Sequence, residues 1–253
     1  MSRRRLGVAA CLALLSGCTG SLSPLSHKLE LGQEPYFVFA ADGEAGEGDL
    51  FASPAAAGQL FQVTFTRLDE RLPRLSPDGS LLAFVRSPSR SDSARSEIWV
   101  MNLINGAERR VAEPGAINPV ALAWATDSRS LYVESATGVF VVAAPPERPS
   151  VHTAEGVERS RADTAMLVLV GDPPIGAVQQ CAGGEGLCIR HNDGSEDLLD
   201  GGARWPAVWA PDSLAYEING DFVVRPLAGG TTRVLRWTRP VSHAREMSYF
   251  APR

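Results

Sequence analysis

Short apolar runs recur along the chain, and a tight polar turn precedes each of them. In the clearest copy, Leu75-Ser76-Pro77-Asp78-Gly79 leads into the apolar run 81–85. Similar units begin at Trp124 and Trp209, and a weaker copy begins at Leu169. Proline presets φ for such a turn, and Asp or Ser caps its backbone amides. The pattern predicts antiparallel strands and gives the polar turn residues a structural role.

Each copy continues into a third strand, a hairpin turn such as Asn105-Gly106, and a short fourth strand. Asn-Gly and Asp-Gly are strong hairpin signals. Four short strands that recur every 40 to 50 residues or so are typical of propeller blades. We expect five blades. The first combines about residues 35–66 with residues 246–252, and the others span about residues 68–114, 118–156, 164–200 and 204–236. The alternatives are a sixth, degenerate blade and an unrelated β-sandwich.

The two ends of the repeat region complement each other. The run 36–40 reads as a second strand with no first strand before it. The segment 248–252 resembles 207–211, an innermost strand that is cut off at its turn. Closing the ring would remove exposed sheet edges, which favour aggregation. We therefore predict an all-β fold, a single propeller of four-stranded blades whose ring the C-terminal strand closes.

The best copy of the repeat carries a family resemblance. Leu-Ser-Pro-Asp-Gly-Ser-Leu-Leu-Ala-Phe, followed by Glu-Ile-Trp-Val-Met-Asn, resembles the repeat of TolB and related WD40-like propellers, and the copies cover about residues 35–253. The same repeat occurs in propeller domains of prolyl-oligopeptidase-type peptidases. The resemblance implies a partner protein in the cell envelope. TolB has six blades, an additional N-terminal domain and no lipid anchor, so this chain departs from it in three ways.

The N-terminus predicts export and lipidation. A basic start at residues 1–5 precedes the apolar run 6–15, which is shorter than the roughly 20 residues that span a bilayer. Leu15-Ser16-Gly17-Cys18 resembles a bacterial lipobox. We expect a signal peptide at 1–17, lipidated Cys18 with a flexible tether at 18–34, and the propeller at 35–253. An ordinary signal peptide with an incidental Cys18 is the alternative.

Thr19, which follows Cys18, and the net charge of the mature chain limit the expected location of the protein and the classes of partner that it is expected to bind. The resemblance to lipobox-type proteins of Gram-negative bacteria implies that Thr19, in place of Asp, directs the protein to the outer membrane, on its periplasmic side or at the cell surface. The chain has 24 Lys+Arg and 29 Asp+Glu, and residues 1–17 hold three Arg and no acid, so the mature charge is 21 − 29 = −8. Nucleic acid and an anionic membrane surface both require clustered basic charge, so neither is expected as the main partner. We expect a monomer that binds unidentified envelope proteins.

Candidate chemistry is sparse. Cys181 and Cys188 flank a glycine-rich hairpin and form either a disulfide or two free thiols. The chain has no Gly-x-Ser-x-Gly elbow, no His-Glu-x-x-His and no phosphate-binding glycine loop. The acidic segment 42–49 departs from the calcium-loop template. We expect no cofactor, no metal and no catalytic residue.

One polar insertion stands out between the second and third strands of its blade. It spans residues 86–96 and contains Arg86, Arg90 and Arg95. It is either a mobile loop or an arm that contacts a partner at one propeller face. We expect a non-catalytic protein-binding scaffold. The alternatives are a hydrolase or lyase, and a binder of a small ligand or glycan, with the site in the central channel.

Overall fold

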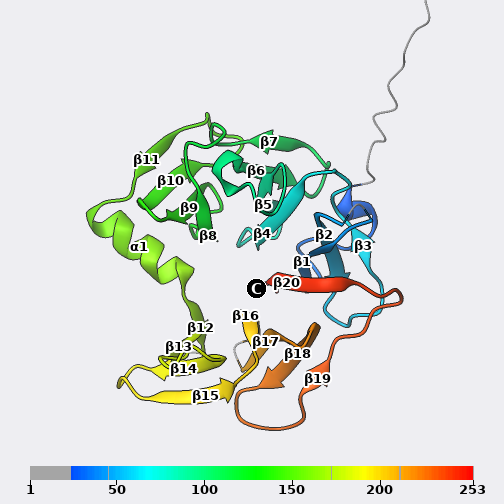
Figure 1. The fold of residues 1–253 in the computed structure, drawn as a ribbon, viewed down its shortest axis with the longest axis vertical. Helices are drawn as coiled ribbons and strands as arrows, with labels where there is room; N and C mark the ends of the chain where they lie inside the picture. The colour runs from blue at the N-terminus through cyan, green and yellow to red at the C-terminus, as the bar shows by residue number, and fades with distance from the viewer. Residues whose placement is uncertain (1–23, 45, 172, 211, 253) are drawn as a thin grey trace, which may run out of the picture.

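The apolar runs of the repeat form the second strands of five antiparallel sheets, which are arranged as blades around one axis (Figure 1). The computed structural model describes residues 24–44, 46–171, 173–210 and 212–252. Every sheet has four strands. We number the blades I to V in chain order, and in blades II to V the order of the strands from the axis outward follows the chain. The predicted five-bladed β-propeller is confirmed.

Each blade orders its four strands from the axis outward. Blade I contains β20 (Ser242–Phe250), β1 (Tyr36–Asp42), β2 (Gly48–Pro54) and β3 (Phe61–Gln62). Blade II contains β4 (Asp69–Leu75), β5 (Leu81–Ser87), β6 (Glu97–Asn102) and β7 (Glu108–Arg110). Blade III contains β8 (Pro119–Trp124), β9 (Ser130–Ser135), β10 (Gly138–Ala143) and β11 (Val151–Thr153). Blade IV contains β12 (Val168–Val170), β13 (Gly176–Gln180), β14 (Leu187–His191) and β15 (Glu196–Asp200). Blade V contains β16 (Arg204–Ala210), β17 (Ser213–Ile218), β18 (Asp221–Pro226) and β19 (Arg233–Val234).

The innermost strands define the two faces of the ring. We call the side where β4 and β20 begin the entry face, and the side where they end, at the polar repeat turns, the turn face. In the best turn, Asp78 accepts hydrogen bonds from the Ser76 hydroxyl at 2.6 Å and the Ser80 amide at 3.0 Å. The Asp127 carboxylate accepts an amide hydrogen bond in the same way. These turn residues therefore stabilise backbone, as the pattern predicts.

The C-terminal strand closes the ring, as predicted. β20 pairs with β1 from Tyr36 opposite Phe250 to Asp42 opposite Ser242. Two of its side chains also bond the backbone of β4: Glu246 Oε2 accepts from the Leu72 amide at 2.6 Å, and Ser248 Oγ accepts from the Leu75 amide at 2.9 Å. The closing strand therefore joins blade I to blade II.

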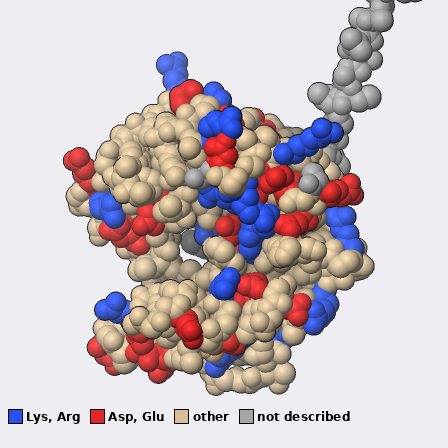
Figure 2. Space-filling view, in the orientation of Figure 1, with Lys and Arg blue, Asp and Glu red and all other residues tan. Residues whose placement is uncertain are grey.

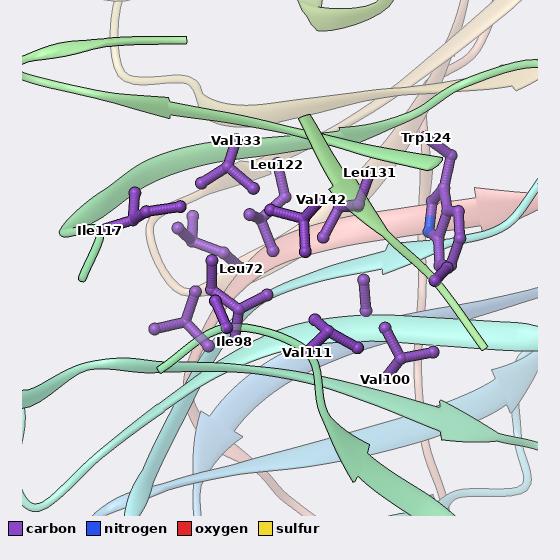
Figure 3. Packing of buried hydrophobic residues seen from close by; sticks show 14 of the residues in the cluster. Leu72, Ile98, Val100, Val111, Ile117, Leu122, Trp124, Leu131, Val133 and Val142 are labelled. Carbon is purple, nitrogen blue, oxygen red and sulfur yellow. The ribbon is translucent and has the colours of Figure 1, made fainter. Parts of the chain in front are cut away.

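Apolar clusters fill four of the five joints between blades. Figure 3 shows the cluster between blades II and III, where Leu72 and Ile98 face Leu122 and Val133. Comparable clusters join blade I to blade II, blade V to blade I, and blade IV to blade V. Burying side chains of this size stabilises the fold by roughly 1.5–3 kcal/mol each.

The joint between blades III and IV is different. The helix α1 (Gly156–Met166) lies there and packs on β8 (Figure 1). Its buried Ala162 belongs to a small cluster with Tyr132, Val139 and Val141 of blade III. The sequence pattern did not predict this helix, because most of its side chains are polar and exposed and show no apolar stripe.

A second difference concerns the segment before the first strand. Residues 18–34 were expected to form a tether, but residues 24–34 pack on blades I and II. The short helix η1 (Leu25–His27) contributes buried Leu25, and Leu29 is buried in the same cluster. Two leucines in a polar segment are enough to dock it, so this part of the expectation is wrong.

Candidate functional site

The entry face carries a cluster of ion pairs where blades I and II meet. Asp42 accepts from Arg90 Nη2 at 2.7 Å and from His243 Nδ1 at 2.6 Å. Arg245 lies 3.4 Å from Asp42 and 3.5 Å from the buried Asp69. Figure 2 shows basic and acidic side chains side by side over this part of the ring. Although burial opposes the charged form, Arg90 and His243 hold the pKa of Asp42 below its usual value.

A second, buried pair lies in blade II below this cluster. Glu70 is fully buried and accepts from Thr66 Oγ1 at 2.6 Å and from Arg86 Nε at 2.9 Å. Arg86 also reaches Glu108 at 3.0 Å. Burial raises the pKa of Glu70 to about 7 in spite of these partners. Arg86 Nε and Nη1 are used within the blade, whereas Arg86 Nη2 is buried without a hydrogen-bond partner. The network therefore connects the strands of blade II.

These contacts change the interpretation of the arginine-rich insertion. Arg86 is buried at the end of β5, so it cannot be an exposed partner contact. Arg90 is half exposed and forms ion pairs with Asp42 and Asp69. Arg95, in the short helix η2 (Ser93–Arg95), is exposed and pairs with Asp92. The exposed part of the insertion is therefore residues 88–95, and a contact role for Arg90 and Arg95 stays a prediction.

The central channel opens on the turn-face side as a cavity of about 390 Å³. The ends of the inner strands line it, together with residues 165–168, which run from the last turn of α1 into β12. Among its lining residues only Arg74 carries a formal charge, and the side chain of Arg74 is bonded to the backbone carbonyls of Leu122 and Pro73. General acid–base chemistry requires a carboxylate, His or a comparable group in reach of the substrate. The described lining contains no Asp, Glu, His or Cys, and its one phenol belongs to Tyr249, whose ring stacks on Trp209 at 4.5 Å.

One side of this channel is less covered than the others. The innermost strand of blade IV, β12, has 3 residues, whereas β8 has 6 and β16 has 7. The segment that joins α1 to β12 exposes Leu167 to 50%, and Val208 on β16 is exposed to 36%. Figure 2 shows the surface hollowed between blades III and IV beside the axis. We call Leu167, Val208 and the channel lining next to them the channel mouth.

The cysteine pair lies on another edge of the ring. Cys181 and Cys188 are joined by a disulfide in the hairpin between β13 and β14. This hairpin borders a groove of about 650 Å³ between blades IV and V, together with half-exposed Trp205. The pair therefore shapes a surface loop, and its sulfurs are used in the bond.

Other predicted features lie outside the described residues or have no counterpart there. Cys18 is outside the described residues. In the described ranges, no group of three or more His, Cys, Asp and Glu is placed to hold a metal ion. No helix in these ranges is both long and apolar enough to cross a membrane.

The channel mouth was missed by the sequence reasoning. It forms because a helix replaces most of an inner strand, and the polar residues of that helix resemble a surface loop. The weaker repeat copy at Leu169 was a signal, since a short innermost strand leaves its neighbours uncovered.

The molecule is a β-propeller, and comparisons with known proteins agree. No protein-family model and no curated sequence matches the chain. TolB from Acinetobacter baumannii is among the similar solved structures, with 12% identity, a TM-score of 0.48, and coverage of 93% of this chain and 68% of that chain. A chain of a nidogen/laminin complex has 10% identity, a TM-score of 0.53, and coverage of 86% of this chain and 99% of that chain. At such identity the likeness to the nidogen/laminin chain shows the fold alone.

Proposed function

We propose that this chain is an outer-membrane lipoprotein that acts as a non-catalytic scaffold and binds another envelope protein at the channel mouth. The observation that carries the proposal is the mouth itself. It is a cavity of about 390 Å³ with exposed Leu167 and Val208 and one internally bonded charge. Polar atoms make up more of this lining than apolar atoms, and Leu167 and Val208 add an apolar edge. The mouth therefore suits a partner segment that hydrogen-bonds the channel wall and packs an aliphatic side chain on these two residues.

The rest of the ring supports this role. Apolar clusters at four joints and the closing strand hold the blades in fixed positions. A surface that is already ordered loses little conformational entropy when it binds a partner. Residues 88–95 on the entry face offer a second contact through Arg90 and Arg95, although both already pair with carboxylates.

Photocrosslinking in native envelopes tests the proposal. A photoreactive amino acid replaces Leu167 in the channel mouth in one variant and Leu198 of β15 in the control. Leu198 is exposed to 64%, so it is at least as accessible, but it lies on an outer strand. We expect one defined protein adduct from position 167 and none from position 198.

Two further variants complete this test. Val208→Asp places a charge in the mouth and should abolish the adduct while the thermal unfolding curve is kept. Cys18→Ser should weaken recovery of the same adduct from envelopes by removing the lipid. No adduct at position 167, or equal adducts at both positions, contradicts the proposal and favours the small-ligand or enzyme alternatives.

A further inference from the structure

The docked N-terminal segment fixes where an anchor attached to Cys18 would hold the ring. Leu25 and Leu29 are buried against blades I and II. The Ser26 amide donates to the Leu103 carbonyl at 3.2 Å, and the Ser26 hydroxyl donates to the Ile104 carbonyl at 2.7 Å. Leu103 and Ile104 belong to the β6–β7 turn, on the turn face. The chain therefore enters the fold at the turn-face rim of blades I and II.

The chain between the anchor and this rim is short. From Cys18 to Pro24 there are 24 − 18 = 6 residue steps. Fully extended, they reach at most about 20 Å. A folded chain of this length has a radius of gyration of about 17 Å and so a diameter of roughly 45 Å. Because about 20 Å is less than half of this diameter, Pro24 lies in the half of the molecule that is nearer to the bilayer.

The surface around the entry point includes a side chain suited to lipid. Ile104 is exposed to 55% at the tip of its turn, next to the docked segment. Blade IV and α1 lie across the ring from η1 (Figure 1). If the rim that holds η1 lies on the lipid, the joint between blades III and IV points away from the bilayer.

We propose that the lipid surface contacts the turn-face rim of blades I and II, with Ile104 at the contact, and that the docked segment 24–34 orients the ring in this way. This inference rests on the proposed lipidation of Cys18. It adds a membrane-contact surface to the proposed scaffold and predicts that the joint between blades III and IV stays accessible to soluble proteins.

Fluorescence quenching on vesicles tests the orientation. The full lipidated protein is reconstituted with phosphatidylethanolamine and phosphatidylglycerol, including a nitroxide-headgroup lipid. Ile104→Cys and the control Leu198→Cys each carry the same fluorophore on a thiol, since Cys181 and Cys188 are paired. Both positions are exposed aliphatic side chains. We expect most of the fluorescence to be lost at position 104 and little at position 198.

A release variant sharpens the test. Leu25→Asp should undock η1 and lengthen the chain before the first strand from 6 to 36 − 18 = 18 residue steps. Quenching at position 104 should then fall toward that at position 198, while flotation with vesicles is kept. The unfolding transition should stay cooperative but shift to lower stability, because the burial of Leu25 is lost.

The outcomes separate the two proposals. Equal quenching at both positions, stronger quenching at position 198, or no change in Leu25→Asp overturns the orientation but keeps the anchor if the protein floats with vesicles. Failure to float, with the non-lipidated Cys18→Ser protein behaving identically, overturns the anchor and the orientation together.

Discussion

The joint between blades I and II and the joint between blades III and IV differ in how the inner strands meet. At the first, β20 and β4 lie together, and Glu246 and Ser248 bond the backbone of β4. At the second, α1 is the element that contacts β8, and β12 has 3 residues. The same repeat therefore forms a tightly bonded joint where side chains of the innermost strand hydrogen-bond the next blade, and an open joint where the innermost strand is short.

The largest test of this comparison removes the closing strand. Deleting residues 242–253 leaves β1 without its inner neighbour and exposes the apolar cluster around Phe37 and Phe39. We expect loss of the cooperative fold, because the missing contacts exceed the total stability of about 5–15 kcal/mol. Circular dichroism and size-exclusion chromatography measure this. Deleting residues 251–253 keeps β20 whole and is the control, and a cooperative unfolding transition in the longer deletion would contradict the closure.

The second test removes the buried cation of blade II. Arg86→Ala removes the ion pair of the buried Glu70 and the guanidinium that lies over the rings of Phe84 and Trp99. At a pH of about 8, where the folded parent protein ionises Glu70, this should lower the free energy of unfolding by about 3–5 kcal/mol. Arg90→Ala removes a half-exposed pair and should cost less than about 1 kcal/mol. Urea denaturation compares them. Similar losses for both variants would mean that Arg86 is not buried in the folded protein.

The third test uses pH. The pKa of Glu70 is raised from 4.5 to about 7 by burial, so the folded protein keeps this proton when the unfolded chain has lost it. The folded state then binds more protons between these values, and stability falls as the pH rises through about 7. The loss should be up to about 3 kcal/mol. Asp49, whose pKa is also raised by burial, acts in the same direction.

Chemical denaturation at pH values of about 5 and 8 measures this loss. Glu70→Gln stays neutral throughout, so its stability should change much less over the same range. The lowered pKa of Asp42 has the opposite sign, and its effect falls below pH of about 4, outside this window. Equal pH dependence in Glu70→Gln and the parent protein would show that Glu70 is not the group responsible.

The fourth and smallest test compares single side chains at the two joints. Glu246→Ala leaves the buried Leu72 amide without an acceptor, which should cost about 1–3 kcal/mol. Glu158→Ala on α1 removes an exposed contact with His152 and should cost less than about 0.5 kcal/mol. Thermal unfolding ranks the two variants. A larger effect from Glu158 would reverse the comparison of the joints.

Much of the fold could be predicted from the sequence because its signals are local. The turn at Asp78 and its copies set the strand spacing, and the strand-like run 248–252 indicated how the ring closes. The channel mouth could not be predicted, because α1 has no apolar stripe, and the weak repeat copy at Leu169 indicated only that the innermost strand β12 is short. Arg86 was wrongly expected to be an exposed partner contact for a related reason. Its burial depends on Glu70 and Glu108, which belong to other strands.

Hydrogen–deuterium exchange of the intact protein tests the central claim most directly, namely that the ring is closed at blades I and II and open at blades III and IV. Amide protection reports the free energy of local opening. We predict that amides of β1, β20 and β4 exchange only with global unfolding, while those of α1 and β12 exchange through much easier local opening. Protection in α1 and β12 equal to that in β1 and β20 would contradict the account.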